Sequence, residues 1–489
     1  MHPRLQRICS VLVILVMLAL PVSALAVPAS TSASSISAYD KTRPQDLVES
    51  NLYAQSAVLI DARTGEVLFS KAPDTKLNPA SITKILTAML VLEKCDLDEM
   101  VTAKISAMGT YEATWVPLQD GESMTAKDML YGLLLKSYND VAAALAVHVG
   151  GSLSGFAEMM NRKAQELGCT NSNFVVPHGL TTENHYTTAN DMAKIARAAL
   201  QNETFRQIVS TQQYVFPSSN KRNDSISLTN SNKMLPGSGS EYAYEGNIGV
   251  KTGYTLAAKH TFVGAAQRDG ISLICVVMGS QGPESLRAEG KWMDAQKLLD
   301  YGFAAYEKLD VVALYAANPV ECDIEGYIEG DAGRLKLDLG DSSALAGIIV
   351  KKSEKEAAYL NFQQNVTVRY TADRIAPIER NEKIGEMTYS YGGGSVTVDL
   401  LASRNVLQAV VAASPISDDL SFDASSSAAV PPTLTDIAVG IKHSPVRFLA
   451  LLLLVPVLIL LGLVVSMLVD LSRQRKRLRA RTSRSRGYY

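Results

Sequence analysis

The chain has 489 residues, 47% of them hydrophobic, and its 47 basic and 49 acidic side chains leave a formal net charge of −2. This length and apolar share predict two or three domains with sizeable cores, and the near-neutral charge gives no sign of a nucleic-acid partner. The six histidines show no metal-type spacing such as HExxH, so neither a metal nor a cofactor is predicted.

The N-terminal residues have the pattern of a secretory signal peptide. Two arginines precede an apolar run over residues 8–20, and Ala24-Leu25-Ala26 supplies the small residues of a cleavage site. We expect a signal peptide over residues 1–26 and a flexible leader over residues 27–50. An uncleaved anchor is the alternative, and it is disfavoured because the apolar run is short for a membrane span.

The next segment alternates as a β-hairpin should. Strands are expected from Val58 to Ile60 and from Glu66 to Phe69, with a turn at Arg63-Thr64-Gly65. Both are expected to be edge strands that lead into the next helix.

That helix is predicted over residues 78–93, where Pro79 suits the first turn and apolar residues recur at helical spacing. Ser81 and Lys84 then share one face at its start. A hydroxyl needs a neighbouring base to act as a nucleophile at neutral pH, and a half-buried lysine beside other cations can lose its proton and serve. The helix N-terminus adds N–H groups where an oxyanion forms.

The Ser-x-x-Lys spacing also occurs at Ser218 and Lys221. This second copy lies in a polar run without apolar periodicity, which predicts a solvated loop. Context therefore favours Ser81 and Lys84.

Two further polar motifs follow. Thr125 and Asp128 form a plausible capping box for a helix that ends at Lys136. Ser137-Tyr138-Asn139 comes next, followed by a second helix of small residues from Asp140. An alternative is that the serine and asparagine of this motif only cap the second helix.

The third motif is Lys251-Thr252-Gly253, in an extended run from Ile248. Strands over residues 262–267 and 271–278 surround a turn at Asp269-Gly270, which predicts neighbouring antiparallel strands. Taken alone, Lys251 on such a strand is more often a solvated edge charge.

The C-terminal part changes character after a helix expected over residues 285–305. Short alternating runs predict a β-rich domain over residues 309–411, and a Ser-, Ala-, Asp- and Pro-rich linker follows over residues 412–445.

The uncharged run from Phe448 to Val469 predicts a transmembrane helix over residues 446–470, since about 1.5 Å per residue suffices to cross a hydrocarbon core of about 30 Å. A buried core helix is the alternative, but the tail over residues 471–489 is crowded with basic residues. The positive-inside rule places this tail in the cytoplasm and the preceding domains outside.

Four cysteines remain after the signal: Cys95, Cys169, Cys275 and Cys322. Two disulfides are possible, but buried free thiols are favoured, because most lie in apolar or periodic surroundings and no CxxC spacing occurs.

In this order, Ser81-x-x-Lys84, Ser137-x-Asn139 and Lys251-Thr252-Gly253 resemble the three-motif active site of the penicillin-recognising serine enzymes. Further segments look like low-molecular-weight penicillin-binding proteins that are D-alanyl-D-alanine carboxypeptidases: Pro177-His178-Gly179-Leu180, His185-Tyr186-Thr187-Thr188-Ala189, Asp191-Met192-Ala193 and Gly253-Tyr254-Thr255. The resemblance covers roughly residues 52–401.

The resemblance implies an α+β fold. A β-lactamase/transpeptidase-like domain, an antiparallel sheet with helices, is expected over residues 51–308. A small β-sandwich domain over residues 309–411 and the C-terminal transmembrane helix would follow it.

The resemblance also implies roles for the motif residues. Ser81 would be the acyl-ester nucleophile, Lys84 the proton acceptor and Ser137 a proton shuttle to the departing D-alanine amine.

In the same resemblance, Asn139 would bind the substrate backbone, and Lys251 with Thr252 of the Lys-Thr-Gly253 motif would hold the terminal carboxylate of the peptide. The backbone N–H groups of Ser81 and Tyr254 would form the oxyanion hole.

Three residues depart from the family pattern: Tyr138 stands where glycine is common, Lys259 follows Ala258 where glycine is common, and Lys291 stands where arginine is frequent. They bear on pocket shape rather than reaction type. Tyr138 is expected to narrow the cleft or to stack on substrate.

The expected function is a membrane-bound serine D-Ala-D-Ala carboxypeptidase that removes the terminal D-alanine from peptidoglycan stem pentapeptides outside the membrane and binds penicillin covalently. A β-lactamase is one alternative, but no Glu-x-x-Leu-Asn match occurs between Asp140 and Val250. A catalytically silent muropeptide-binding scaffold is the other.

Overall fold

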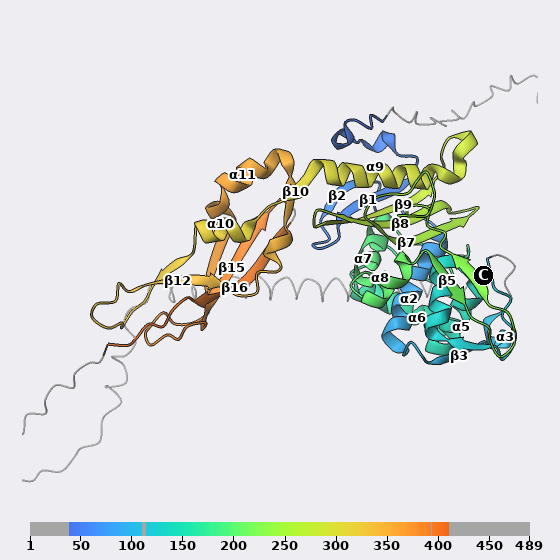
Figure 1. Ribbon diagram of the computed structural model, residues 1–489, viewed down its shortest axis with the longest axis horizontal. Helices are drawn as coiled ribbons and strands as arrows, with labels where there is room; N and C mark the ends of the chain where they lie inside the picture. Colours follow the sequence, from blue (N-terminus) through green and yellow to red (C-terminus); the bar gives the residue numbers. More distant parts are fainter. Residues whose placement is uncertain (1–38, 110–113, 393, 410–489) are drawn as a thin grey trace, which may run out of the picture. The chain divides into compact units, whose positions relative to one another are not determined.

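The computed structural model describes residues 39–109, 114–392 and 394–409 (Figure 1). The predicted signal peptide, most of the leader, the linker, the transmembrane helix and the basic tail lie outside these residues. Within the part of the chain that is described, no single helix is long and apolar enough to span a membrane. One helix pair, Asn139–Gly150 with Leu153–Glu166, passes that test by length and composition only and is bent by 82°.

A five-stranded antiparallel sheet organises the first part of the chain, in the order β2-β1-β9-β8-β7. Its strands are β1 (Ser56–Asp61), β2 (Val67–Lys71), β7 (Asn247–Thr255), β8 (Lys259–Arg268) and β9 (Ile271–Ser280). The predicted hairpin and the predicted β7-β8-β9 neighbours are confirmed.

The prediction that both hairpin strands are edge strands is wrong for β1. This strand pairs with β9 along its other side, from Ser56 opposite Met278 to Asp61 opposite Leu273. All six of its residues are buried, as expected for an interior strand with both faces covered.

The two faces of the sheet belong to different hydrophobic clusters, because successive side chains of a strand point to opposite faces. Val58 and Ile60 join one cluster, whereas Ala57 and Leu59 join the other. On the second face, α9 (Gly290–Ala305) contributes Trp292 and lies along the sheet in Figure 1.

Most helices build the cluster on the first face. They are α2 (Lys84–Lys94), α3 (Ile105–Met108), α4 (Ala126–Tyr131), α5 (Asn139–Gly150), α6 (Leu153–Glu166), α7 (Ala189–Ala199) and α8 (Glu203–Ser210). Two small hairpins accompany them: β3 (Met100–Thr102) with β4 (Ser123–Thr125), and β5 (Gln213–Phe216) with β6 (Ile226–Thr229).

The predicted helix cap at Thr125 is confirmed, since the Thr125 hydroxyl accepts a hydrogen bond from the Asp128 N–H. The helix continues from α4 as a single π-helical stretch, η4 (Gly132–Lys136), and ends at Lys136 as predicted. A π-helical turn inside a helix is often found beside functional residues.

From Leu309 onward, the described residues form a third hydrophobic cluster around the antiparallel sheet β11-β12-β16-β15-β14. Its strands are β11 (Glu321–Asp323), β12 (Arg334–Leu339), β14 (Val366–Tyr370), β15 (Lys383–Tyr391) and β16 (Gly394–Ala402). Two helices, α10 (Val311–Ala317) and α11 (Lys355–Leu360), and the pair β10 (Tyr306–Lys308) with β13 (Ile349–Lys351) complete this part.

The four cysteines are free, as predicted. Cys169, Cys275 and Cys322 are buried, whereas Cys95 is partly exposed.

Candidate active site

The turn that carries Ser81 is tighter than the predicted α-helix. A 3₁₀ turn, η3 (Ala80–Thr83), precedes α2, and Ala80 adopts a φ of 52° that L-residues rarely take. The Thr83 hydroxyl donates to the Ala80 carbonyl oxygen at 2.8 Å. Ser81 and Lys84 still share one face, since Lys84 Nζ lies 3.0 Å from Ser81 Oγ.

The Lys84 ammonium position is enclosed by acceptors. Besides Ser81 Oγ, its Nζ donates to Asn139 Oδ1 at 2.7 Å and to the His178 carbonyl oxygen at 2.8 Å. The side chain is 0% exposed. Burial lowers the pKa of Lys84 well below its usual value, the positive charge of Lys251 lowers it further, and Asp140 opposes both.

A neutral amine has two N–H groups and one lone pair. Asn139 Oδ1 and the His178 carbonyl oxygen only accept, so they take both N–H groups of neutral Lys84. The lone pair is then left for the Ser81 hydroxyl, which is a donor as well as an acceptor. In its neutral form Lys84 is thus oriented to take a proton from Ser81.

The second motif meets the same lysine. Ser137 follows η4 with a left-handed φ of 67°, and its buried Oγ has no hydrogen-bond partner among the described residues. The residue before α5, Tyr138, makes no side-chain cap, and Asn139 Oδ1 accepts from Lys84. The alternative that Ser137 and Asn139 only cap the second helix is therefore wrong.

Asp140, which the sequence did not single out, fixes the loop beside this motif. Its carboxylate accepts hydrogen bonds from the backbone N–H groups of Val116 and Leu118, and the Asn139 N–H donates to the Thr114 carbonyl oxygen at 2.8 Å. Burial raises the Asp140 pKa, and these backbone donors oppose the rise.

The third motif lies on β7, at the edge of the sheet. Lys251 is only 1% exposed, so the interpretation as a solvated edge charge is wrong. Burial lowers the pKa of Lys251 to about 7, and its Nζ donates to the Thr252 carbonyl oxygen at 3.0 Å. The Thr252 hydroxyl lies 2.9 Å from that of Ser231, a residue that no sequence motif singles out.

Gly253 is required where β7 passes the nucleophile. A Cβ at this position would lie 2.9 Å from the Ser81 backbone nitrogen and 2.4 Å from Thr261 Oγ1. The adjoining Tyr254 is half exposed and stacks on His260 with ring centroids 4.5 Å apart. The strand therefore runs directly past the Ser81 amide.

The segment Pro177-His178-Gly179 packs against the turn that carries Ser81 and against α2. The Thr87 hydroxyl donates to the Pro177 carbonyl oxygen at 2.6 Å, and Gly179, with φ +83°, lies so close that an added Cβ would come within 1.9 Å of the Ala80 carbonyl oxygen. His178 contributes its backbone carbonyl oxygen to the environment of Lys84, and a side-chain motif cannot predict such a backbone group.

A buried histidine completes this support. His185 Nε2 lies 3.1 Å from Thr83 Oγ1, and its Nδ1 accepts from the Val175 N–H at 3.0 Å. Burial lowers the pKa of His185 to about 4, and burial followed by the charge of Lys84 lowers that of His178 to about 3. Both rings are therefore neutral at physiological pH.

The three departures from the family pattern have structural explanations. Tyr138 is 8% exposed and packs edge-to-face on Phe216, so the expectation that it stacks on substrate is wrong. Lys259 has a φ of 57°, which explains why glycine suits this position. Lys291 is mostly buried, with its Nζ 4.6 Å from the centroid of the Trp292 ring.

The second Ser-x-x-Lys copy lies in a loop, as predicted. Ser218 and Lys221 are both exposed, and the Lys221 backbone N–H donates to the Ser219 hydroxyl. Neither side chain has the enclosed environment of Lys84.

The sequence profile of the D-alanyl-D-alanine carboxypeptidase family matches residues 41–282. The chain is 32% identical over 365 residues to D-alanyl-D-alanine carboxypeptidase DacF of Bacillus subtilis. This alignment covers 72% of this chain and 85% of the relative. It is 36% identical over 263 residues to DacB2 of Mycobacterium tuberculosis, covering 53% of this chain and 86% of the relative.

Among solved structures, penicillin-binding protein 5 of Haemophilus influenzae is similar to this chain with a TM-score of 0.51 and 28% identity. The similarity covers 73% of this chain and 98% of that structure. Together with the sequence relatives, this similarity gives a mixed helix and antiparallel-sheet fold of the penicillin-binding, transpeptidase-like type. The chain belongs to the D-alanyl-D-alanine carboxypeptidase family.

Proposed function

We propose that this protein is a serine D-Ala-D-Ala carboxypeptidase that removes the terminal D-alanine from peptidoglycan stem pentapeptides and is acylated by penicillin. The observation that carries the proposal is the environment of Lys84. Its buried Nζ gives both neutral N–H groups to carbonyl oxygens and lies 3.0 Å from Ser81 Oγ.

In the first step, Ser81 Oγ attacks the carbonyl carbon of the penultimate D-alanine while its proton passes to the Lys84 lone pair. The negative charge that develops on the substrate oxygen is stabilised by the backbone N–H groups of Ser81 and Tyr254. Support comes from the close passage of β7 at Gly253 beside the Ser81 nitrogen.

In the second step, the C–N bond breaks and the leaving amine needs a proton. Ser137 donates its hydroxyl proton to that amine and recovers one from the Lys84 ammonium. Its buried Oγ has no partner within the described residues, which leaves the hydroxyl available for this exchange. Water then attacks the acyl-ester carbonyl carbon and passes one proton to Lys84. The C–O bond to Ser81 breaks, and Lys84 returns that proton to Ser81 Oγ, which regenerates the serine and the neutral amine.

Lys251 and Thr252 recognise the C-terminal end of the peptide substrate. A cation with a neighbouring hydroxyl binds a free carboxylate through charge-assisted hydrogen bonds, which favours cleavage at the terminal residue. An entering carboxylate also favours the protonated form of Lys251, whose pKa burial lowers to about 7 in the free protein. Asn139 would contact the substrate backbone as well as Lys84.

The remaining segments fit an enzyme attached to the outer side of the cytoplasmic membrane. The signal peptide over residues 1–26 would direct export, and the apolar run from Phe448 to Val469 with its basic flank would form a single membrane span with a cytoplasmic tail.

Residues 309–411 would form the small β-sandwich that separates the catalytic domain from the membrane. A five-stranded sheet and the bridges that join Glu325 with Ile375 and Ile378 with Val406 support this proposal.

The function is tested by incubating the full-length protein with a defined muropeptide pentapeptide and following the products by mass spectrometry. Loss of one D-alanine, absent in Ser81→Ala, is expected. Rapid turnover of penicillin without shortening of the peptide would instead identify a β-lactamase. Binding of the peptide with neither reaction would identify a silent scaffold.

A further inference from the structure

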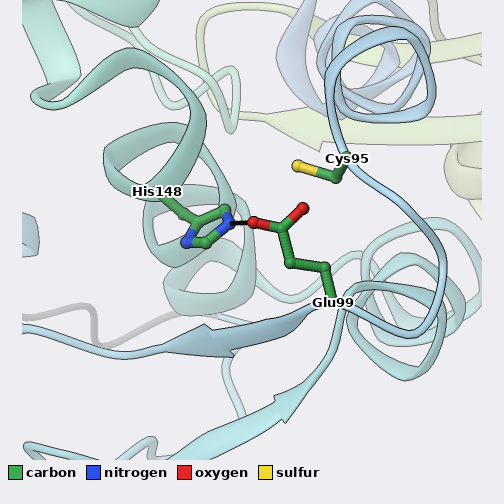
Figure 2. A group of neighbouring side chains, drawn as sticks. All are labelled: Cys95, Glu99 and His148. Carbon is green, nitrogen blue, oxygen red and sulfur yellow. Dashed lines mark hydrogen bonds and ion pairs between the residues drawn. The ribbon is translucent and has the colours of Figure 1, made fainter.

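Three side chains beyond the end of α2 that is opposite Lys84 bring metal-ligand atoms together. Cys95, Glu99 and His148 each offer one such atom, and these atoms lie within 4.8 Å of one another. Figure 2 shows the three side chains converging, with the His148 ring joined to the Glu99 carboxylate by a 2.8 Å contact.

We propose that Cys95, Glu99 and His148 form a binding site for a divalent cation of the zinc type. A thiolate, an imidazole and a carboxylate are all ligands of Zn²⁺, which binds them at about 2.0–2.3 Å. Calcium and magnesium prefer all-oxygen sites, so this mixed set does not suit them.

Two of the three residues lie in the loop between α2 and β3, and the third is brought to them from α5 by the fold. Cys95 follows the last residue of α2, Glu99 precedes β3, and His148 lies in the last turn of α5. An ordinary surface ion pair would involve Glu99 and His148 alone, whereas here the Cys95 sulfur also lies within 4.8 Å of both partners' ligand atoms.

The site has three protein ligands and room for a fourth from solvent. The side chains of His148 and Glu99 are 25% and 43% exposed, and Cys95 is partly exposed. A water molecule would complete a tetrahedral set. On binding, the Cys95 thiol releases one proton to solvent. The Nε2–H of His148, which faces Glu99 Oε1 at 2.8 Å in the metal-free protein, is replaced by a bond from Nε2 to the cation, so that the ring proton is then on Nδ1.

The local charge favours a cation. The Glu99 and Asp96 carboxylates lie close enough to Cys95 to act on it electrostatically. The same carboxylates lower the free energy of a bound dication.

The proposed ion would join the C-terminal ends of α2 and α5. The opposite ends of these helices carry Lys84 and Asn139, whose side chains are hydrogen-bonded at 2.7 Å. Binding to the folded state alone would therefore stabilise the helix pair that holds two of the three motifs.

The test uses the full-length protein without an affinity tag, stripped of metal and titrated with Zn²⁺ against a chromophoric chelator, and separately with Co²⁺. We expect one equivalent to bind, a rise in the thermal unfolding midpoint, and a thiolate-to-cobalt charge-transfer band. Cys95→Ser and His148→Gln should each weaken binding by about tenfold or more, since loss of even a ligand's supporting partner costs about 10- to 100-fold.

Matched controls are Glu93→Gln, which removes a carboxylate near the same end of α2 that pairs with Lys163, and Cys322→Ala, which removes a buried thiol elsewhere. Both should bind the cation as the unchanged protein does. The proposal is overturned if the unchanged protein competes with the chelator no better than Cys95→Ser, or if the cobalt band survives in Cys95→Ser. Near-ultraviolet circular dichroism checks that each variant is folded.

Discussion

Replacing Asn139 by aspartate tests the protonation state of Lys84 directly. The substitution keeps the shape of the side chain and puts a carboxylate oxygen where Oδ1 now accepts from Lys84 Nζ at 2.7 Å. The new anion would favour the lysine ammonium and so occupy the lone pair that must receive the Ser81 proton. The perturbation thus acts on the base while leaving Ser81 in place.

The magnitude follows from Coulomb's law. Two unit charges at this 2.7 Å separation attract by about 6 kcal/mol at an effective dielectric constant of about 20. Burying the new carboxylate costs part of this, and if about half remains, the fraction of neutral Lys84 falls by about 100-fold at 1.36 kcal/mol per decade. Acylation at neutral pH should fall by about the same factor.

The assay is the second-order rate of acylation by a labelled penicillin, measured from acid to alkaline pH. In Asn139→Asp the Lys84 ammonium loses its proton only at higher pH, so the pH profile of the acylation rate should shift in the alkaline direction. The difference in rate between the variant and the unchanged protein should therefore decrease as pH rises. Asn139→Leu is the matched control, because it removes the acceptor without adding charge and should lower the rate without that shift. Acylation of Asn139→Asp within a few-fold of the unchanged protein, with the same pH profile, would refute a neutral Lys84 as the base.

Three further predictions follow from the site. Lys251→Ala should lower kcat/KM on a free-acid peptide by about ten- to hundredfold, because a charge-assisted hydrogen bond contributes about 1.5–3 kcal/mol. The loss should be clearly smaller on the peptide amide, and equal losses on both substrates with no pH shift would make Lys251 a structural residue. Lys251→Met should raise the free energy of unfolding by a few kcal/mol near pH 7 and by progressively less toward pH 10.5. The buried lysine has a pKa of about 7 in the folded state against 10.5 in the unfolded state, so the unchanged protein becomes more stable as pH rises between these values. The same stability difference at both pH values in denaturant unfolding would contradict this. Gly179→Ala should lower the thermal unfolding midpoint and the rate of penicillin acylation far more than Gly151→Ala. Both positions have positive φ, but only a Cβ at Gly179 would meet the Ala80 carbonyl oxygen, at 1.9 Å. Similar losses in the two variants would show that the close contact at Gly179 does not matter.

Local features of the site were predictable because they depend on local spacing. Ser81 and Lys84 meet because one helical turn separates them, and the Thr125 cap forms within its own helix turn. The strands around Lys251 were identified by alternation and by the turn at Asp269-Gly270.

Features that depend on distant parts of the chain were not predictable from such patterns. The interior position of β1 comes from pairing with β9, so a hairpin pattern cannot reveal it. The burial of Lys251 and the packing of Tyr138 on Phe216 likewise depend on tertiary contacts.

Backbone groups were missed for a different reason. The His178 carbonyl oxygen that accepts from Lys84 could belong to any residue type, so no side-chain motif identifies it. The left-handed φ of Ala80 also has no signature in a residue that normally avoids it.

The most direct test of the account identifies the acylated residue. The full-length protein is labelled with penicillin and digested, and the labelled peptide is sequenced by mass spectrometry, in parallel with Ser81→Ala and Ser218→Ala. The account predicts a penicilloyl adduct on Ser81, no label in Ser81→Ala, and unchanged labelling in Ser218→Ala. An adduct on any other serine, or labelling that survives in Ser81→Ala, would contradict it.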